Sequence, residues 1–172
     1  AQAATARPFF LTIMTNVGHF PYAVPRGTPV RAFPGVPLQK ADYYNAVTYG
    51  DGFVRDVIAE LRGRGLLDRS LVMILGDHGE AFGEHGLVWH TGVLYEEALR
   101  IPGIVRLPAE LHRSGRVAGL RQQIDVFPTV VDVLGLEPRG GRVTGRSRVS
   151  DASGHDARVF APRFDDRALA LR

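Results

Sequence analysis

The chain has 172 residues, of which 45% are hydrophobic and 23% charged, so it fits one ordinary globular domain or a large piece of one and excludes general disorder. The net charge is +3, but the arginines are scattered among acidic residues, which favours a solvated surface and indicates no nucleic-acid partner. Cysteine is absent, which excludes a disulfide scaffold, a cysteine-zinc site and a thiol nucleophile within these residues.

The first half of the chain predicts one strand, one long loop and one helix. Residues 8–14 form a continuous apolar run rich in β-forming residues, typical of a strand buried on both faces. The prolines and glycines that follow exclude a helix before about residue 40. From 42 to 64, apolar side chains recur at helical spacing, and Gly63 and Gly65 then end the helix.

The second half alternates strands and helices. We expect strands at 70–75 and 101–107, separated by a loop at 80–93 and a short helix at 94–99, and a further helix at 125–134. Beyond residue 137 the pattern weakens, with two late strands expected at 159–161 and 168–171. The alternation of buried strands and helices predicts an α/β layered fold with a mostly parallel central sheet.

The strand at 70–75 ends in Gly76-Asp77-His78-Gly79. Ligands of open α/β sheets bind at the carboxyl ends of strands, and the two glycines are expected to let the backbone turn so that Asp77 and His78 converge on one ion. A carboxylate and an imidazole suit a divalent cation such as zinc, manganese, magnesium or calcium. The alternative is a capped turn, because aspartate is a common N-cap residue.

The loop after this strand concentrates three histidines and three acidic residues in fourteen positions: Asp77, His78, Glu80, Glu84, His85 and His90. Imidazoles suit an anion site because they donate hydrogen bonds and can protonate a leaving group. For His85 we prefer a role in pinning the loop to one in ligation. Glu80 and Glu84 are interpreted as loop-structuring residues.

The longer string is specific: GDHGEAFGEHGLVWHTGVLYEEALRIPGIVRLP. It resembles the carboxy-terminal motif region of the sulfatase family in the alkaline phosphatase superfamily, which shows Asp-His-Gly-Glu, Gly-Glu-His-Gly, a His or Lys, Tyr-Glu and Arg-Ile/Val-Pro. The opening PFFLTIMTNVGHFPYAVP and the later IDVFPTVVDVLGL are similar to segments of the same family in the same order. The resemblance implies an alkaline-phosphatase-like fold, with residues 1–136 as the carboxy-terminal part of a catalytic domain and 137–172 as a tail of that domain.

The resemblance also implies roles for four residues. Asp77 and His78 fall on metal ligands of the family, which implies a divalent metal cofactor. His19 and His90 fall on positions that hold the sulfuryl or phosphoryl oxygens and assist the leaving group. His90 stands where many arylsulfatases have lysine, and both side chains are cationic donors. The alternative for His19 is an ordinary loop histidine.

The family's nucleophile motif is absent from these 172 residues, which contain no Cys-x-Pro-x-Arg or Ser-x-Pro-x-Arg string. Two metal ligands are also fewer than the three or more that protein sites usually provide. The chain begins without methionine, which we interpret as the start of a piece of a longer protein. We therefore expect this piece alone to be catalytically inactive.

Three functions stay open. The first is hydrolysis of sulfate or phosphate esters by the intact protein. The second is a membrane-anchored transferase of phosphoglycerol or phosphoethanolamine groups, tethered through an upstream segment, because the PFFLTIMT opening resembles that branch. The third is a non-catalytic half-domain that binds an anion or a partner. The resemblance favours a periplasmic, extracellular or membrane-associated location, which nothing in the chain itself shows.

Overall fold

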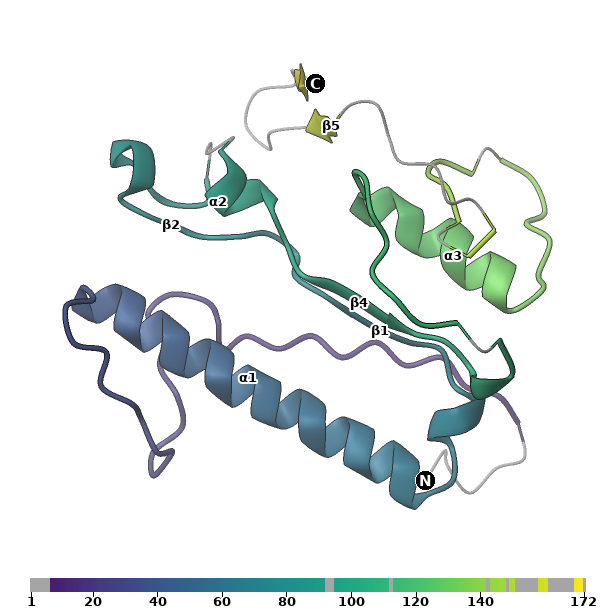
Figure 1. Cartoon of the computed structure of the whole chain (residues 1–172), viewed down its shortest axis with the longest axis horizontal. Coiled ribbons are helices and arrows are strands. Elements are labelled where there is room, and N and C mark those ends of the chain that lie inside the picture. Colours follow the sequence, from purple (N-terminus) through teal and green to yellow (C-terminus); the bar gives the residue numbers. More distant parts are fainter. Residues whose placement is uncertain are drawn as a thin grey trace. The chain divides into compact units, whose positions relative to one another are not determined.

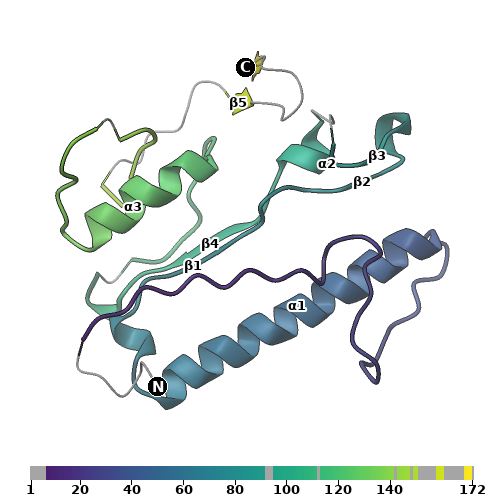
Figure 2. The ribbon, with the colours of Figure 1, turned by 180° about the vertical axis from the view of Figure 1, so that it is seen from behind.

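The computed structural model describes residues 7–91, 95–111, 113–141, 143–147 and 149–150, and the backbone of two further strands at 158–160 and 169–171. The chain divides into two compact units, Ala1–Asp68 and Arg69–Arg172. Most of the helices and strands of both are labelled in Figures 1 and 2.

The first unit is built around helix α1 (Leu38–Gly63). Its start, earlier than predicted, follows Pro37, which lies just outside the helix where a missing N–H costs nothing. The helix holds the preceding loop through Asn45, whose side chain accepts a hydrogen bond from Arg31 N at 2.8 Å and donates to Arg31 O at 3.1 Å. Tyr22 from this loop is buried, with its ring edge-on to Tyr43 at a centroid distance of 5.4 Å.

The strand predicted at 8–14 is not present. These residues form no strand (the dark purple trace in Figures 1 and 2), and Phe10 and Met14 are 79% and 89% exposed. A continuous apolar run becomes a buried strand only where other strands supply hydrogen bonds and both faces are covered. In the part of the chain that the structure describes, no strand pairs with this segment.

The described residues of the second unit contain three antiparallel strand pairs. Strand β1 (Val72–Leu75) pairs with β4 (Gly103–Arg106), β2 (Ala81–Phe82) with β3 (Val88–Trp89), and β5 (Arg158–Phe160) with β6 (Leu169–Leu171). The two late strands are thus confirmed. The predicted parallel sheet is not confirmed, since every pair among the described residues is antiparallel. Continuous apolarity predicts burial, but it carries no information on strand direction.

The helices of this unit are short. They are η3 (Glu84–Gly86), α2 (Glu96–Leu99), η4 (Ala109–Leu111), η5 (Gln123–Asp125) and α3 (Val126–Val133), and a further turn, η2 (Leu67–Arg69), lies where the two units join in the chain. Aspartate is a common N-cap residue, and Asp125 directly precedes α3. It lies at that position of α3, but its carboxylate instead accepts hydrogen bonds from Gln122 N and Arg146 N, both at 2.9 Å.

No helix in the described residues is both long enough and apolar enough to cross a membrane.

Candidate functional site

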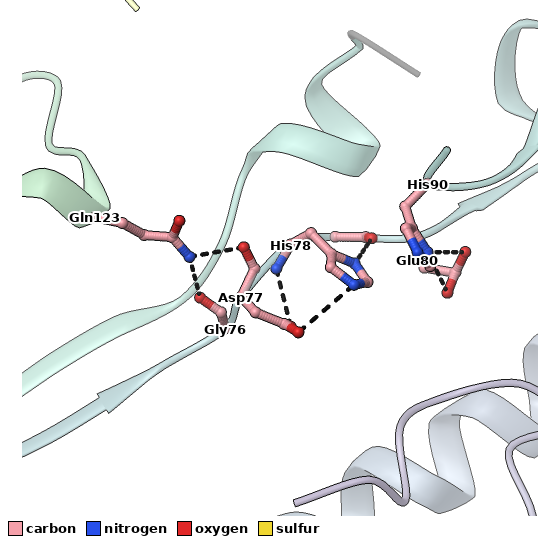
Figure 3. Close-up of polar contacts among 7 residues, drawn as sticks. Gly76, Asp77, His78, Glu80, His90 and Gln123 are labelled. Carbon is pink, nitrogen blue, oxygen red and sulfur yellow. Dashed lines mark hydrogen bonds and ion pairs between the residues drawn. The ribbon is translucent and has the colours of Figure 1, made fainter. Parts of the chain in front are cut away.

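The segment that follows β1 is held on both sides by backbone hydrogen bonds. Gly76 N donates to Pro102 O at 3.2 Å, and Gly79 N donates to Ala98 O at 2.7 Å. The Gln123 side chain also donates to Gly76 O at 3.1 Å and to Asp77 O at 2.7 Å (Figure 3). The main chain that carries Asp77 and His78 is therefore fixed from three other parts of the unit.

Glycine at position 79 is required for space. A Cβ atom there would lie 2.1 Å from Glu97 O, well inside van der Waals contact. Neither Gly76 nor Gly79 has a positive φ, so the course of the main chain here does not depend on a left-handed conformation. Instead, Gly79 lets the segment pass directly against the start of α2.

Asp77 and His78 point toward one another (Figure 3). Asp77 Oδ2 lies 3.6 Å from His78 Nε2, while Asp77 Oδ1 accepts a hydrogen bond from His78 N at 3.0 Å. His78 Nδ1 lies 2.8 Å from Gly79 O, which assigns the ring proton to Nδ1 and the lone pair to Nε2. A carboxylate oxygen and an imidazole lone pair on the same side fit two ligands of a divalent cation.

The two donors are only part of a metal site. Within the described ranges, no group of three or more His, Cys, Asp or Glu side chains is arranged to hold a metal ion. The Asp77 side chain is 85% exposed and that of His78 is 39% exposed. Their donor chemistry therefore fits a cation that takes its remaining ligands from elsewhere.

The structure brings His90 against His78. Their rings stack with a centroid distance of 3.8 Å and an interplanar angle of 25°. His90 Nδ1 lies 3.3 and 3.4 Å from the two carboxylate oxygens of Glu80 (Figure 3), and the Glu80 side chain is only 5% exposed. Three of the four site residues predicted from the sequence, Asp77, His78 and His90, thus form one cluster.

The hairpin of β2 and β3 carries His90 at its end, and its tip is attached to α2. His85, at the tip, has φ 58°, its ring stacks on that of Tyr95 at 3.9 Å, and its Nδ1 lies 2.7 Å from Glu97 Oε1. This agrees with the interpretation that His85 pins the loop. Glu84 has the loop-structuring contact that was expected, since its carboxylate accepts a hydrogen bond from Phe82 N at 2.6 Å.

The contact between His85 and Glu97 predicts a pH effect on stability. The hydrogen bond from His85 holds the pKa of the Glu97 carboxyl below its usual value of 4.5. A lowered folded-state pKa stabilises the protein above pH 4.5, and this contribution is lost as the pH falls through the folded-state pKa. We expect the stability difference between wild type and Glu97→Gln, measured by urea unfolding, to shrink between pH 6 and pH 3.5.

The matched control for that experiment is Glu110→Gln, because Glu110 is an exposed acid in η4 of the same unit. Its difference from wild type should stay near zero across the range. A Glu97→Gln difference that does not change with pH would contradict the assignment.

His19 lies in the first unit, in the loop that precedes α1. Its Nδ1 is 2.8 Å from Phe20 O, and its main chain joins a turn in which Tyr22 N donates to His19 O at 2.8 Å. As in His78, the contact of Nδ1 with the next residue's carbonyl assigns the proton to that nitrogen. The Tyr22 side chain is buried, which fixes this turn and with it the main-chain position of His19.

The sulfatase family model matches residues 1–136 of the chain. This chain belongs to the sulfatase family. A phosphonate monoester hydrolase from Silicibacter pomeroyi shares its fold with a TM-score of 0.54 and 32% identity, over 63% of this chain and 21% of that one. This supports an alkaline-phosphatase-like fold for the chain. The family is also the one that the sequence motifs predicted.

Two curated relatives have names that indicate different activities. Mouse steryl-sulfatase is 33% identical over 150 residues, which cover 80% of this chain and 23% of the relative. A lipoteichoic acid synthase-like protein of Bacillus subtilis, YvgJ, is 24% identical over 157 residues, covering 84% of this chain and 25% of that protein. The sulfatase chain therefore spans about a quarter of the length of these relatives.

The contacts of Gln123 and Tyr95 were not predicted from the sequence. Gln123 is 46 residues from Asp77 along the chain, and a glutamine before a helix gives no sign of such a contact. Tyr95 was noted only as part of a motif, whereas the structure shows it under the ring of His85.

Proposed function

We propose that this chain supplies metal-binding and anion-binding side chains to an enzyme that hydrolyses sulfate or phosphate esters. The observation that carries the proposal is the stack of His78 on His90. It brings a candidate metal ligand and a candidate anion donor, twelve positions apart in the sequence, into direct contact. In ester hydrolysis the cation and the oxyanion donor must act on the same group of atoms, so this contact is what the reaction needs.

The roles follow from the donor atoms. Asp77 Oδ2 and His78 Nε2 would hold a divalent cation, which when bound polarises the ester and stabilises developing negative charge. As an imidazolium, with a proton on each ring nitrogen, His90 would donate to an oxygen of the sulfuryl or phosphoryl group through Nε2, since Nδ1 donates to Glu80. His19 is assigned a similar role on the leaving-group oxygen. The nucleophile is assigned to a part of the protein outside these 172 residues, which is why we propose that they are inactive alone.

The test is an assay of the full-length protein with an aryl sulfate, an aryl phosphate and an aryl phosphonate monoester. We expect turnover of at least one, loss of turnover on chelation, and its return with one of calcium, magnesium, manganese or zinc. His90→Gln and His19→Gln should each lower kcat about 10²- to 10³-fold, the typical cost of one oxyanion donor. Turnover that survives both chelation and His90→Gln would overturn the proposal.

A second candidate function is transfer of a phosphoglycerol or phosphoethanolamine group by a membrane-anchored enzyme. The likeness to the lipoteichoic acid synthase-like protein favours it, and covers a larger share of this chain than the likeness to steryl-sulfatase does. A hydrolase transfers the sulfuryl or phosphoryl group to water, whereas the transferase would transfer its group to an alcohol. Product analysis in the presence of a phosphoglycerol donor and a lipid alcohol would distinguish them. The third candidate, an anion-binding half-domain, predicts binding of sulfate or phosphate without turnover of any ester.

A further inference from the structure

The carboxylate of Glu80 is buried beside His90. Its side chain is 5% exposed, whereas that of His90 is 32% exposed. A buried carboxylate is costly unless it is paired or hydrogen-bonded. The Nδ1 atom of His90 lies almost equally far from the two oxygens, at 3.3 and 3.4 Å, so one N–H is shared between them.

The strand pairing of the hairpin explains why these two residues meet. Ala81 is opposite Trp89 and Phe82 is opposite Val88 in the antiparallel register of β2 and β3. Positions 80 and 90 directly flank this pairing, one on each strand. The hairpin therefore brings Glu80 and His90 close together at its open end.

The His90 ring is constrained on two sides. The face of the ring stacks on His78, and the Nδ1 edge meets Glu80 (Figure 3). An imidazole without such partners can turn by about 180° around χ2, which exchanges a ring nitrogen for a ring carbon at each edge. With Glu80 at Nδ1, the other nitrogen, Nε2, always faces away from the carboxylate.

We infer that Glu80 is a positioning residue for His90, which fixes the ring so that Nε2 is the atom presented to the substrate oxygen. The inference rests on the proposed function only for the role of His90. Glu80 itself touches neither substrate nor metal in this assignment. Glu84, four residues further along the same hairpin, bonds to Phe82 N instead and provides a matched comparison.

The test is a double-mutant cycle in the full-length protein: wild type, Glu80→Gln, His90→Gln and the double variant, with kcat and KM for the best aryl ester and a melting curve for each. Glutamine keeps the size of Glu80 but loses one of the two acceptor oxygens. We expect Glu80→Gln to lower kcat about 10- to 100-fold with little change in KM, as for loss of an orienting partner of a site histidine. In the His90→Gln background it should change kcat less than about twofold, because residues that act as a unit are not additive.

The control Glu84→Gln should leave kcat unchanged relative to its parent, both in wild type and in the His90→Gln background. A Glu80→Gln effect of equal size with and without His90 would overturn the inference. So would a lower melting temperature with unchanged kcat, because Glu80 would then have only a structural role.

A second readout separates failure of this inference from failure of the proposed function. In protein labelled with ¹⁵N-histidine, the His90 ring signals are assigned by their absence in His90→Gln. We expect one set of His90 ring signals in wild type, with a proton on Nδ1, and two or more sets in Glu80→Gln, where the ring is free to turn. If His90→Gln leaves turnover unchanged, the role of His90 in the proposed function fails, and the ring signals alone decide about Glu80. Identical signals in wild type and Glu80→Gln would overturn the inference.

Discussion

Replacing Asp77 by alanine is expected to lower kcat/KM of the full-length protein about a thousandfold or more. The substitution removes one of the two proposed metal ligands, which lie 3.6 Å apart at the end of β1. A metal ion contributes several kcal/mol to transition-state stabilisation, and each 1.36 kcal/mol changes the rate tenfold. The measurement is steady-state kinetics together with the metal content of the purified protein.

The structure indicates that this loss will not come from unfolding. The Asp77 side chain is 85% exposed, and its Oδ1 accepts a hydrogen bond from the adjacent His78 N. The melting temperature of the metal-free protein should therefore be close to that of metal-free wild type. Asp56→Ala is the matched control, because Asp56 is 70% exposed on α1 and pairs with Arg55 on the surface. Full activity and normal metal content in Asp77→Ala would exclude Asp77 as a ligand.

Replacing Gly79 by alanine is expected to destabilise the protein by about 3 kcal/mol or more, at the upper end of the overpacking range. The new Cβ would lie 2.1 Å from Glu97 O, a main-chain atom that cannot turn away as a side chain can. Relief requires a shift of α2, which would break the hydrogen bond from Gly79 N to Ala98 O. Urea unfolding monitored by circular dichroism measures the change.

Gly103→Ala, in β4 of the same unit, is the control. Its Cβ would meet only the Leu75 side chain, at an ordinary 3.5 Å, and its backbone has no positive φ. Alanine at such a site is neutral or stabilises by up to about 1 kcal/mol, because it restricts the unfolded chain. If Gly79→Ala unfolded at the same urea concentration as Gly103→Ala, the close approach of the segment to α2 would be disproved.

The sequence predicted those parts of the fold that depend on local pattern. Helix α1 was recognised from the spacing of Val47, Val54, Ile58 and Leu61, because a helix face is set by residues a few positions apart. Strands β1 and β4 were recognised as well, but residues 80–93, which were predicted to be a loop, contain the β2–β3 hairpin. The antiparallel pairing was not predicted, since strand direction depends on contacts far apart in the chain. The apolar residues at 8–14 favour a strand. A strand also requires hydrogen bonds to a neighbouring strand, however, and the local sequence does not show whether one is present.

The site, like the fold, was predicted where it depends on residues close together in the sequence. The motif placed Asp77, His78 and His90 within one loop, which the structure resolves into a cluster. The group that fixes the main chain at Asp77, the Gln123 side chain, comes from another element, η5. His19, whose role is proposed, belongs to the other unit.

The stacked rings of His78 and His90 have a thermodynamic consequence. With the roles proposed, one ring binds a cation and the other an anion, and the faces of the rings are in contact. Occupying either ring then changes the free energy of occupying the other, and reciprocity requires that the factor be the same in both directions. A metal dissociation constant determined without sulfate or phosphate would therefore describe a different equilibrium from the one at work during turnover, and the two ligands would have to be titrated together.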